Sequence, residues 1–192
     1  SNALKLAYDA TSDKLTILNP TNHTYFNLDG HKSGTIEDHE LKLIASHYTP
    51  VVEGAIPTGE IAPVEGTVMD FRERKRIGQE INADEEQLTL VQGYDHNWVI
   101  DDYDGTLRLV AKLIGPVSGR KMKVFTDLPG IQFYAGNCIT PQAGKEGASY
   151  VARSGLCLET QFFPDSVHQP LFPSCIFGAG KEYHSVTVYQ FV

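Results

Sequence analysis

The chain has few basic residues, few cysteines and no long hydrophobic run. Its 192 residues include 16 Lys and Arg against 24 Asp and Glu, which gives a formal net charge of −8. An acidic chain is a poor partner for a polyanion, and the single basic run, residues 72–76, is interrupted by Glu73 and is typical of a solvated surface. No apolar stretch reaches the length that crosses a membrane. We therefore expect no nucleic-acid partner and no membrane partner.

The cysteines do not indicate a disulfide framework. Cys138, Cys157 and Cys175 are odd in number, and no two of them form a C-x-x-C pair. This usage is typical of a reducing compartment, so we expect a cytoplasmic protein.

Common cofactor and metal motifs are also missing. The sequence has no glycine-rich phosphate loop, no G-x-S-x-G element and no H-E-x-x-H pair. Histidines do recur every eight residues, but Gly30 and Gly34 interrupt any strand that would align them. The members of this series are His23, His31, His39 and His47. We expect neither a metal site nor a cofactor.

What the chain does contain is a hydrophobic fraction of 41% and a charged fraction of 21%, typical of a globular domain. The first three residues, Ser1-Asn2-Ala3, resemble the remnant of a cleaved expression tag. No linker or repeat divides the remainder. We expect one domain over residues 4–192.

The dominant hydrophobic period is two, which predicts β-strands. Residues 107–113 alternate, with Leu107, Leu109, Ala111 and Leu113 on one face and Val110 among the residues of the other. A terminal strand is expected over residues 184–192, and Asp104-Gly105 is typical of a hairpin turn. Further short strands are expected at Lys14–Leu18, Leu41–Ala45, Trp98–Ile100, Lys121–Thr126 and Ile131–Tyr134.

Three other stretches are less regular. Residues 71–88 are the one helix-like segment, with sparse apolar positions and much charge. Residues 50–70 and 140–149 are rich in loop-forming residues and are expected to be long loops. The fold class we predict is all-β.

Three ionisable side chains lie among aromatic and apolar neighbours: His23, Asp95 and Glu159. A histidine ionises near neutral pH, and burial raises the pKa of a glutamate towards the range useful for a base. Each has a structural alternative: His23 as a core histidine that holds a turn, Glu159 as a carboxylate bonded to backbone amides, and Asp95 as part of a turn. Aromatic residues beside a carboxylate are nevertheless a frequent composition of sugar sites.

These residues belong to an ordered series of motifs. The segments are NPTNHTYFNL (19–28), YTP (48–50), IPTG (56–59), PVEGT (63–67), GYDHN (93–97), PGIQFY (129–134), ETQ (159–161) and FPD (163–165). Together they resemble the aldose 1-epimerases, or galactose mutarotases, and the similarity runs from Leu4 to Val192.

The resemblance implies a large antiparallel β-sandwich of the galactose mutarotase type, with a cleft for a hexose. It implies that His23 is the general acid and Glu159 the general base, that Asp95 and Gln132 hold sugar hydroxyls, and that Tyr25 lines the site. Family members are longer, and their additional part, which would precede Leu4, carries an arginine and a further histidine that contact the sugar.

The implied reaction interconverts the α and β anomers of a hexose such as galactose or glucose. It requires one group to remove the proton of the anomeric hydroxyl and another, on the other side of the sugar, to protonate the ring oxygen. A non-catalytic carbohydrate-binding sandwich is the main alternative, and an epimerase for phosphorylated sugars is a further one. Because an incomplete sandwich exposes sheet edges, self-association into a homodimer is also expected.

Overall fold

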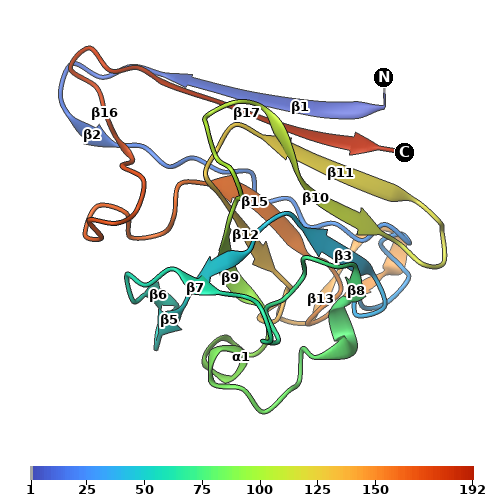
Figure 1. Cartoon of the computed structure of the whole chain (residues 1–192). Helices are drawn as coiled ribbons and strands as arrows, with labels where there is room; N and C mark the ends of the chain where they lie inside the picture. Colours follow the sequence, from blue (N-terminus) through green and yellow to red (C-terminus); the bar gives the residue numbers. More distant parts are fainter. Residues whose placement is uncertain (1) are drawn as a thin grey trace.

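The structure is a computed structural model that describes residues 2–192. Two antiparallel sheets form its framework (Figure 1). The larger, six-stranded sheet has the order β1-β17-β11-β10-β3-β8. Its strands are β1 (Ala3–Ala10), β17 (Tyr183–Phe191), β11 (Lys121–Thr126), β10 (Arg108–Ile114), β3 (Glu40–Leu43) and β8 (Lys75–Arg76).

The second sheet has five strands in the order β15-β12-β9-β4-β7. They are β15 (Cys157–Gln161), β12 (Gly130–Tyr134), β9 (Asp95–Val99), β4 (His47–Thr49) and β7 (Ala62–Pro63). Three two-stranded sheets complete the strands: β2 (Thr16–Ile17) with β16 (Ile176–Phe177), β5 (Val51–Val52) with β6 (Ile56–Pro57), and β13 (Gln142–Ala143) with β14 (Ser149–Tyr150). The all-β prediction is confirmed.

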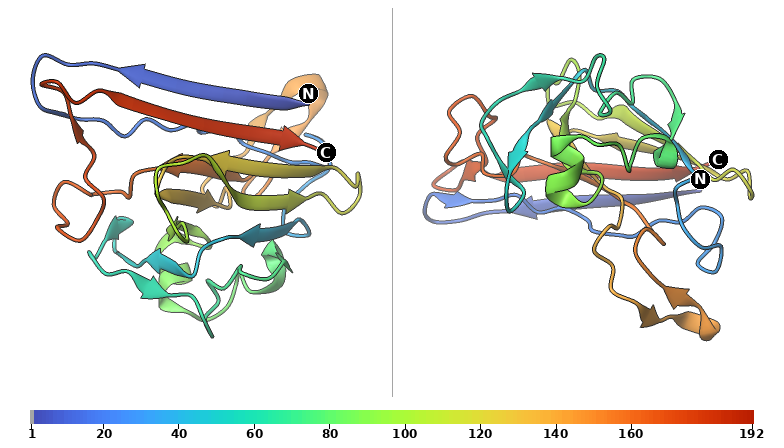
Figure 2. Two further views of the ribbon diagram at one scale, coloured as in Figure 1. Left: turned by 45° about the horizontal axis from the view of Figure 1, so that its top comes forward. Right: turned by 90° about the horizontal axis from the view of Figure 1, so that it is seen from below.

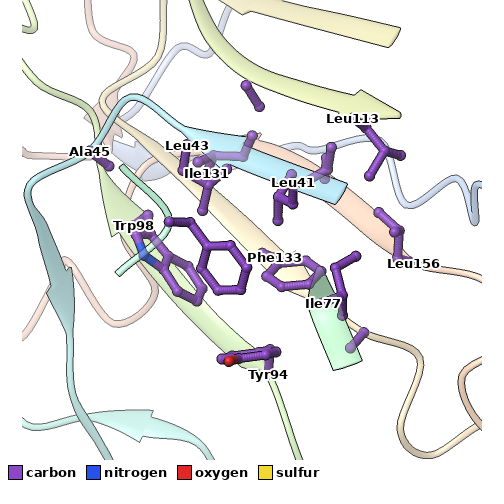
Figure 3. Close-up of a cluster of buried hydrophobic side chains, with 14 of the residues drawn as sticks. Leu41, Leu43, Ala45, Ile77, Tyr94, Trp98, Leu113, Ile131, Phe133 and Leu156 are labelled. Atoms are coloured by element: carbon purple, nitrogen blue, oxygen red, sulfur yellow. The ribbon is translucent and has the colours of Figure 1, made fainter. Parts of the chain in front are cut away.

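The main hydrophobic core joins side chains of both large sheets. Leu41 and Leu43 of β3 and Trp98 and Phe133 of β9 and β12 are fully buried in one cluster (Figure 3). The indole Nε1 of Trp98 donates to the carbonyl of Met69 at 3.0 Å, so its one polar atom is satisfied inside this cluster. Apolar contact between the two sheets makes the molecule a sandwich, as predicted.

The two ends of the chain lie side by side. β1 forms one edge of the six-stranded sheet and pairs with β17 along its whole length (Figures 1 and 2). β1 begins at Ala3, which pairs with Gln190, so the sheet starts one residue before the expected boundary at Leu4. The residues of β1 are exposed or half-buried.

The strict alternation expected over residues 107–113 is wrong at Val110. The register between β10 and β11 shifts between Leu109 and Ala111, which marks a β-bulge. A bulge places two consecutive residues opposite one, so the side chains after it change face. Val110 and Ala111 are therefore both fully buried, whereas Leu107 is exposed.

The helix-like segment 71–88 is mostly not helical. It contains β8 and the short 3-10 helix η1 (Ile77–Gln79), and only its end enters α1 (Glu86–Val91). The Glu85 side chain caps α1 by accepting from the backbone N–H of Leu88. None of the helices in residues 2–192 is long and apolar enough to cross a membrane.

The two expected long loops contain short paired strands. Residues 50–70 hold β5, β6 and β7, and residues 140–149 hold most of the β13–β14 hairpin with η2 (Lys145–Gly147) between its strands. This hairpin projects from the body of the molecule in the right view of Figure 2. A two-residue strand is too short to show a period-two hydrophobic pattern in the sequence.

Candidate active site

The candidate site is built on one face of the five-stranded sheet. Alternate residues of a strand point to opposite faces, so Phe133 and Trp98 enter the core while their neighbours face outward. The register places Gln132 of β12 opposite both Glu159 of β15 and Asn97 of β9. Polar side chains from three adjacent strands therefore lie in one row across this face.

His23 reaches the same face from a segment that runs beside β15. The Asn19 side chain donates to the carbonyl of Phe162 at 2.9 Å and accepts from its N–H at 2.8 Å. The Thr21 hydroxyl donates to the carbonyl of Thr160 at 2.9 Å. These bonds attach the polar residues before His23 to the end of β15 that follows Glu159 and to the residue after that strand.

His23 contacts two side chains of β15 through its two ring nitrogens. Its Nε2 lies 3.5 Å from Oε1 of Glu159, and its Nδ1 lies 3.3 Å from Sγ of Cys157. The imidazole is about half exposed, with 51% of the side chain accessible, whereas the Glu159 side chain is 9% accessible. A half-exposed imidazole therefore contacts a buried carboxyl group.

Burial dominates the electrostatics of the two carboxylates. It raises the pKa of Glu159; the negative charge of Asp95 adds to this shift, and His23 opposes it. Burial also raises the pKa of Asp95, although the hydrogen bond from Gln132 and the charge of His23 act in the other direction. Both acids therefore hold their protons more strongly than carboxyl groups in water.

A chain of amides fixes the orientation of Gln132. Its Nε2 donates to Oδ1 of Asp95 at 2.8 Å, and its Oε1 accepts from Nε2 of Gln161 at 3.1 Å. Gln161 also lies within 3.4 Å of Oδ1 of Asn97. Gly130 permits this close packing, because a Cβ there would lie 2.4 Å from the Asn97 side chain. One N–H and one lone pair of the Gln132 amide are left for a ligand.

Aromatic rings border the acid–base pair. The ring of Tyr25 lies 5.1 Å from that of His23 and 6.2 Å from that of Tyr134, measured between centroids. Tyr25 is also the one predicted site residue that lines a neighbouring cavity of about 580 Å³. This cavity extends from the site towards the β13–β14 hairpin, with Gln142 and Tyr150 among its lining residues.

Comparison with known proteins shows to which family the chain belongs. The family model described as Aldose 1-epimerase matches residues 1–190. The chain belongs to the aldose 1-epimerase family. The galactose mutarotase of Mus musculus is 43% identical over 189 residues, which are 98% of this chain and 54% of that protein. The aldose 1-epimerase of Escherichia coli K12 is 40% identical over 195 residues, or 100% of this chain and 55% of that enzyme.

A solved structure shares the fold of this aldose 1-epimerase family member. The crystal structure of a GalM/aldose epimerase homologue from C. elegans superposes with a TM-score of 0.87 at 30% identity, covering 100% of this chain and 56% of that one. The resemblance and the fold that it implied are thus confirmed. The chain spans about half the length of the curated relatives that it matches.

The structure of this family member brings all five predicted site residues to one region. Four of them form two pairs in direct contact: His23 contacts Glu159, and the Gln132 side chain donates a hydrogen bond to Asp95. Tyr25 joins them through its ring contact with His23. Their roles towards a substrate stay predictions.

The regularly spaced histidines do not converge on a metal-binding group in the part of the chain that the structure describes. His39 is buried, and its Nε2 accepts from the N–H of Leu28 at 3.0 Å. The single cluster there with metal-ligating geometry is His23, Cys157 and Glu159. We missed Cys157 in the sequence, although its spacing of two from Glu159 within a strand predicts that both side chains share a face.

Proposed function

We propose that this chain catalyses the interconversion of the α and β anomers of a hexose such as galactose or glucose. His23 acts as the general acid and Glu159 as the general base. The observation that carries the proposal is the 3.5 Å contact between His23 Nε2 and Glu159 Oε1. An acid and a base this close can act together on two neighbouring atoms of one substrate.

The reaction has such a pair of atoms. The anomeric hydroxyl oxygen and the ring oxygen are bonded to the same carbon, so both lie within reach of adjacent groups. This differs from the expectation that the acid and the base lie on opposite sides of the sugar, because the two groups are in contact. The Glu159 carboxylate removes the hydroxyl proton while protonated His23 gives a proton to the ring oxygen, and the ring opens. Rotation about the C1–C2 bond and reversal of the two transfers then close the ring as the other anomer. The reaction moves protons without any change in oxidation state.

The other predicted residues hold the sugar in this scheme. The half-buried Asp95 carboxylate accepts from a hydroxyl, and the Gln132 amide offers its remaining N–H and lone pair to another. The exposed ring of Tyr25 covers an apolar face of the sugar beside His23. Relatives of this chain carry the names galactose mutarotase and aldose 1-epimerase, which supports a hexose as substrate.

Polarimetry tests the proposal. The optical rotation of freshly dissolved α-D-galactose decays faster in the presence of a catalyst than in buffer alone. We expect purified chain to accelerate the decay, and we expect His23→Asn to remove this acceleration. Calorimetric titration with galactose in the same buffer measures sugar binding and so distinguishes an enzyme from a non-catalytic carbohydrate-binding protein.

Sugar binding by folded wild-type chain without any acceleration would favour the non-catalytic carbohydrate-binding sandwich. Absence of both binding and acceleration in folded chain would contradict the proposal. The comparison matters because the chain spans about half the length of its curated relatives.

We also propose self-association through the edge of the six-stranded sheet. β1 pairs with β17 on one side only, and a free strand edge presents unpaired backbone groups. Sedimentation equilibrium tests the resulting homodimer, and a monomer at all concentrations would contradict it. The cytoplasmic location inferred from the cysteines stays a prediction.

A further inference from the structure

Three metal-ligating side chains meet at the acid–base pair. The ligand atoms of His23, Cys157 and Glu159 all lie within 4.8 Å of one another. The imidazole contacts the other two groups through different nitrogens: Nδ1 lies 3.3 Å from the thiol, and Nε2 lies 3.5 Å from the carboxylate. The bond lengths of tetrahedral Zn²⁺ to nitrogen, oxygen and sulfur require ligand atoms about 3.3 to 3.6 Å apart. An ion binds through one of the two nitrogens, so the side chains must shift to bring the three ligand atoms from within 4.8 Å of one another to this spacing.

The donor set selects a class of ion. One imidazole, one thiol and one carboxyl are the ligand types of zinc and of softer divalent ions, whereas Mg²⁺ and Ca²⁺ prefer oxygen alone. Cys157 and Glu159 are fixed by neighbouring positions on one strand, so two of the three ligands are already held in place.

The surroundings also favour a cation. The Asp95 carboxylate lies close enough to act electrostatically on both Cys157 and Glu159. The open side of His23 leaves room for a fourth ligand from solvent, as in zinc sites with three protein ligands. The net charge of −8 adds a long-range attraction for cations.

We propose that His23, Cys157 and Glu159 form a binding site for Zn²⁺ or a softer divalent ion. Binding takes the Cys157 thiol proton into solvent and places the ion between the two groups that the proposed reaction needs free. The ion therefore blocks that reaction, and this consequence rests on the proposed function. The binding itself does not, because it depends only on the ligand atoms.

Cd²⁺ is a probe that reports ion binding independently of the proposed reaction. A cadmium–thiolate bond gives a charge-transfer absorption in the ultraviolet that reports binding through sulfur without any enzymatic assay. We expect titration of wild-type chain to give a band that saturates at one ion per chain and disappears when Zn²⁺ is added. Cys157→Ser should remove the band, and Glu159→Gln should weaken the affinity by at least about tenfold, since even outer-shell changes cost about 10 to 100-fold.

Cys138→Ser is the matched control, because that thiol is exposed and outside the cluster. It should leave the band unchanged. Circular dichroism verifies that each variant is folded, and Cys157→Ala provides a second test if the serine variant is unfolded. A band that persists in folded Cys157→Ser or Cys157→Ala, or no band in wild type with reduced thiols, would overturn the site. Failure of mutarotation with an intact band would contradict the proposed function alone.

Discussion

Gln132 lies directly opposite Glu159 in the pairing of β12 with β15, and its amide is held between Asp95 and Gln161. The group proposed to hold the sugar and the proposed base are therefore cross-strand neighbours on the edge strand β15 and the adjacent strand β12 of one sheet. Their separation is set by the sheet and not by a loop. A site of this kind is positioned as soon as the strands are paired in the correct register.

The first prediction concerns the pH dependence of the proposed reaction. Glu159 acts as a base only when ionised, and burial together with the charge of Asp95 raises its pKa. We therefore expect kcat/KM to fall as the pH decreases through this raised pKa, at a pH above the value of about 4.3 usual for glutamate. A pH–rate profile from polarimetric rates measures this acidic limb.

Asp95→Asn provides the internal check of this prediction. It removes the neighbouring negative charge, so the acidic limb should move to lower pH even though the rate itself falls. A limb that stays in place, or moves to higher pH, would show that Asp95 does not act on the base.

The second prediction is that Glu159→Gln stabilises the fold. A raised pKa means that the folded state disfavours the carboxylate, so stability is lost as pH rises from the unfolded-state pKa through the folded-state pKa. Glutamine carries no charge at either pH. We expect a gain on the order of 1 kcal/mol in the free energy of unfolding at about pH 8, shrinking towards zero below about pH 4.

Urea denaturation at the two pH values measures this difference. Glu53→Gln is the matched control, because Glu53 is exposed and its replacement should change stability little at either pH. Equal effects of the two substitutions, or a loss of stability in Glu159→Gln at the higher pH, would contradict the burial argument.

The third prediction assigns a positioning role to Gln161. Gln161→Met removes the donor that holds the Gln132 amide. Because one hydrogen bond is worth about 0.5 to 1.5 kcal/mol, we expect KM for galactose to rise by about 2 to 13-fold with a smaller change in kcat. Steady-state polarimetry separates the two constants.

A double-mutant cycle shows whether Gln161 acts through Gln132. In the Gln132→Ala background the effect of Gln161→Met on KM should vanish. An equally large effect in both backgrounds would mean that Gln161 acts on the site by another route.

The sequence predicts features that depend on residues close together in the chain better than features that depend on residues far apart in it. The ordered motifs identified His23, Asp95, Gln132 and Glu159, because each lies in a short recognisable segment. The contact between His23 and Cys157 joins positions 134 residues apart, and no local pattern contains it.

The wrong predictions also arise where pairing with a distant segment determines the local structure. The alternation around Val110 predicted a strand correctly but placed that side chain on the wrong face, because a bulge is fixed by the partner strand β11. The helix-like segment 71–88 is overridden by the pairing of Lys75–Arg76 with β3. Cys157 could have been found, since it precedes Glu159 by two residues in the apolar run that forms β15.

The most direct test of the account is the rate of α-D-galactose mutarotation with wild-type chain and with Glu159→Gln. The substitution preserves the shape of the side chain and removes its basicity. We predict that wild type accelerates the decay of optical rotation and that Glu159→Gln lowers the catalysed rate by at least about 100-fold, as expected for the loss of a general base. A wild-type rate retained by folded Glu159→Gln would contradict the assignment of Glu159 as the base.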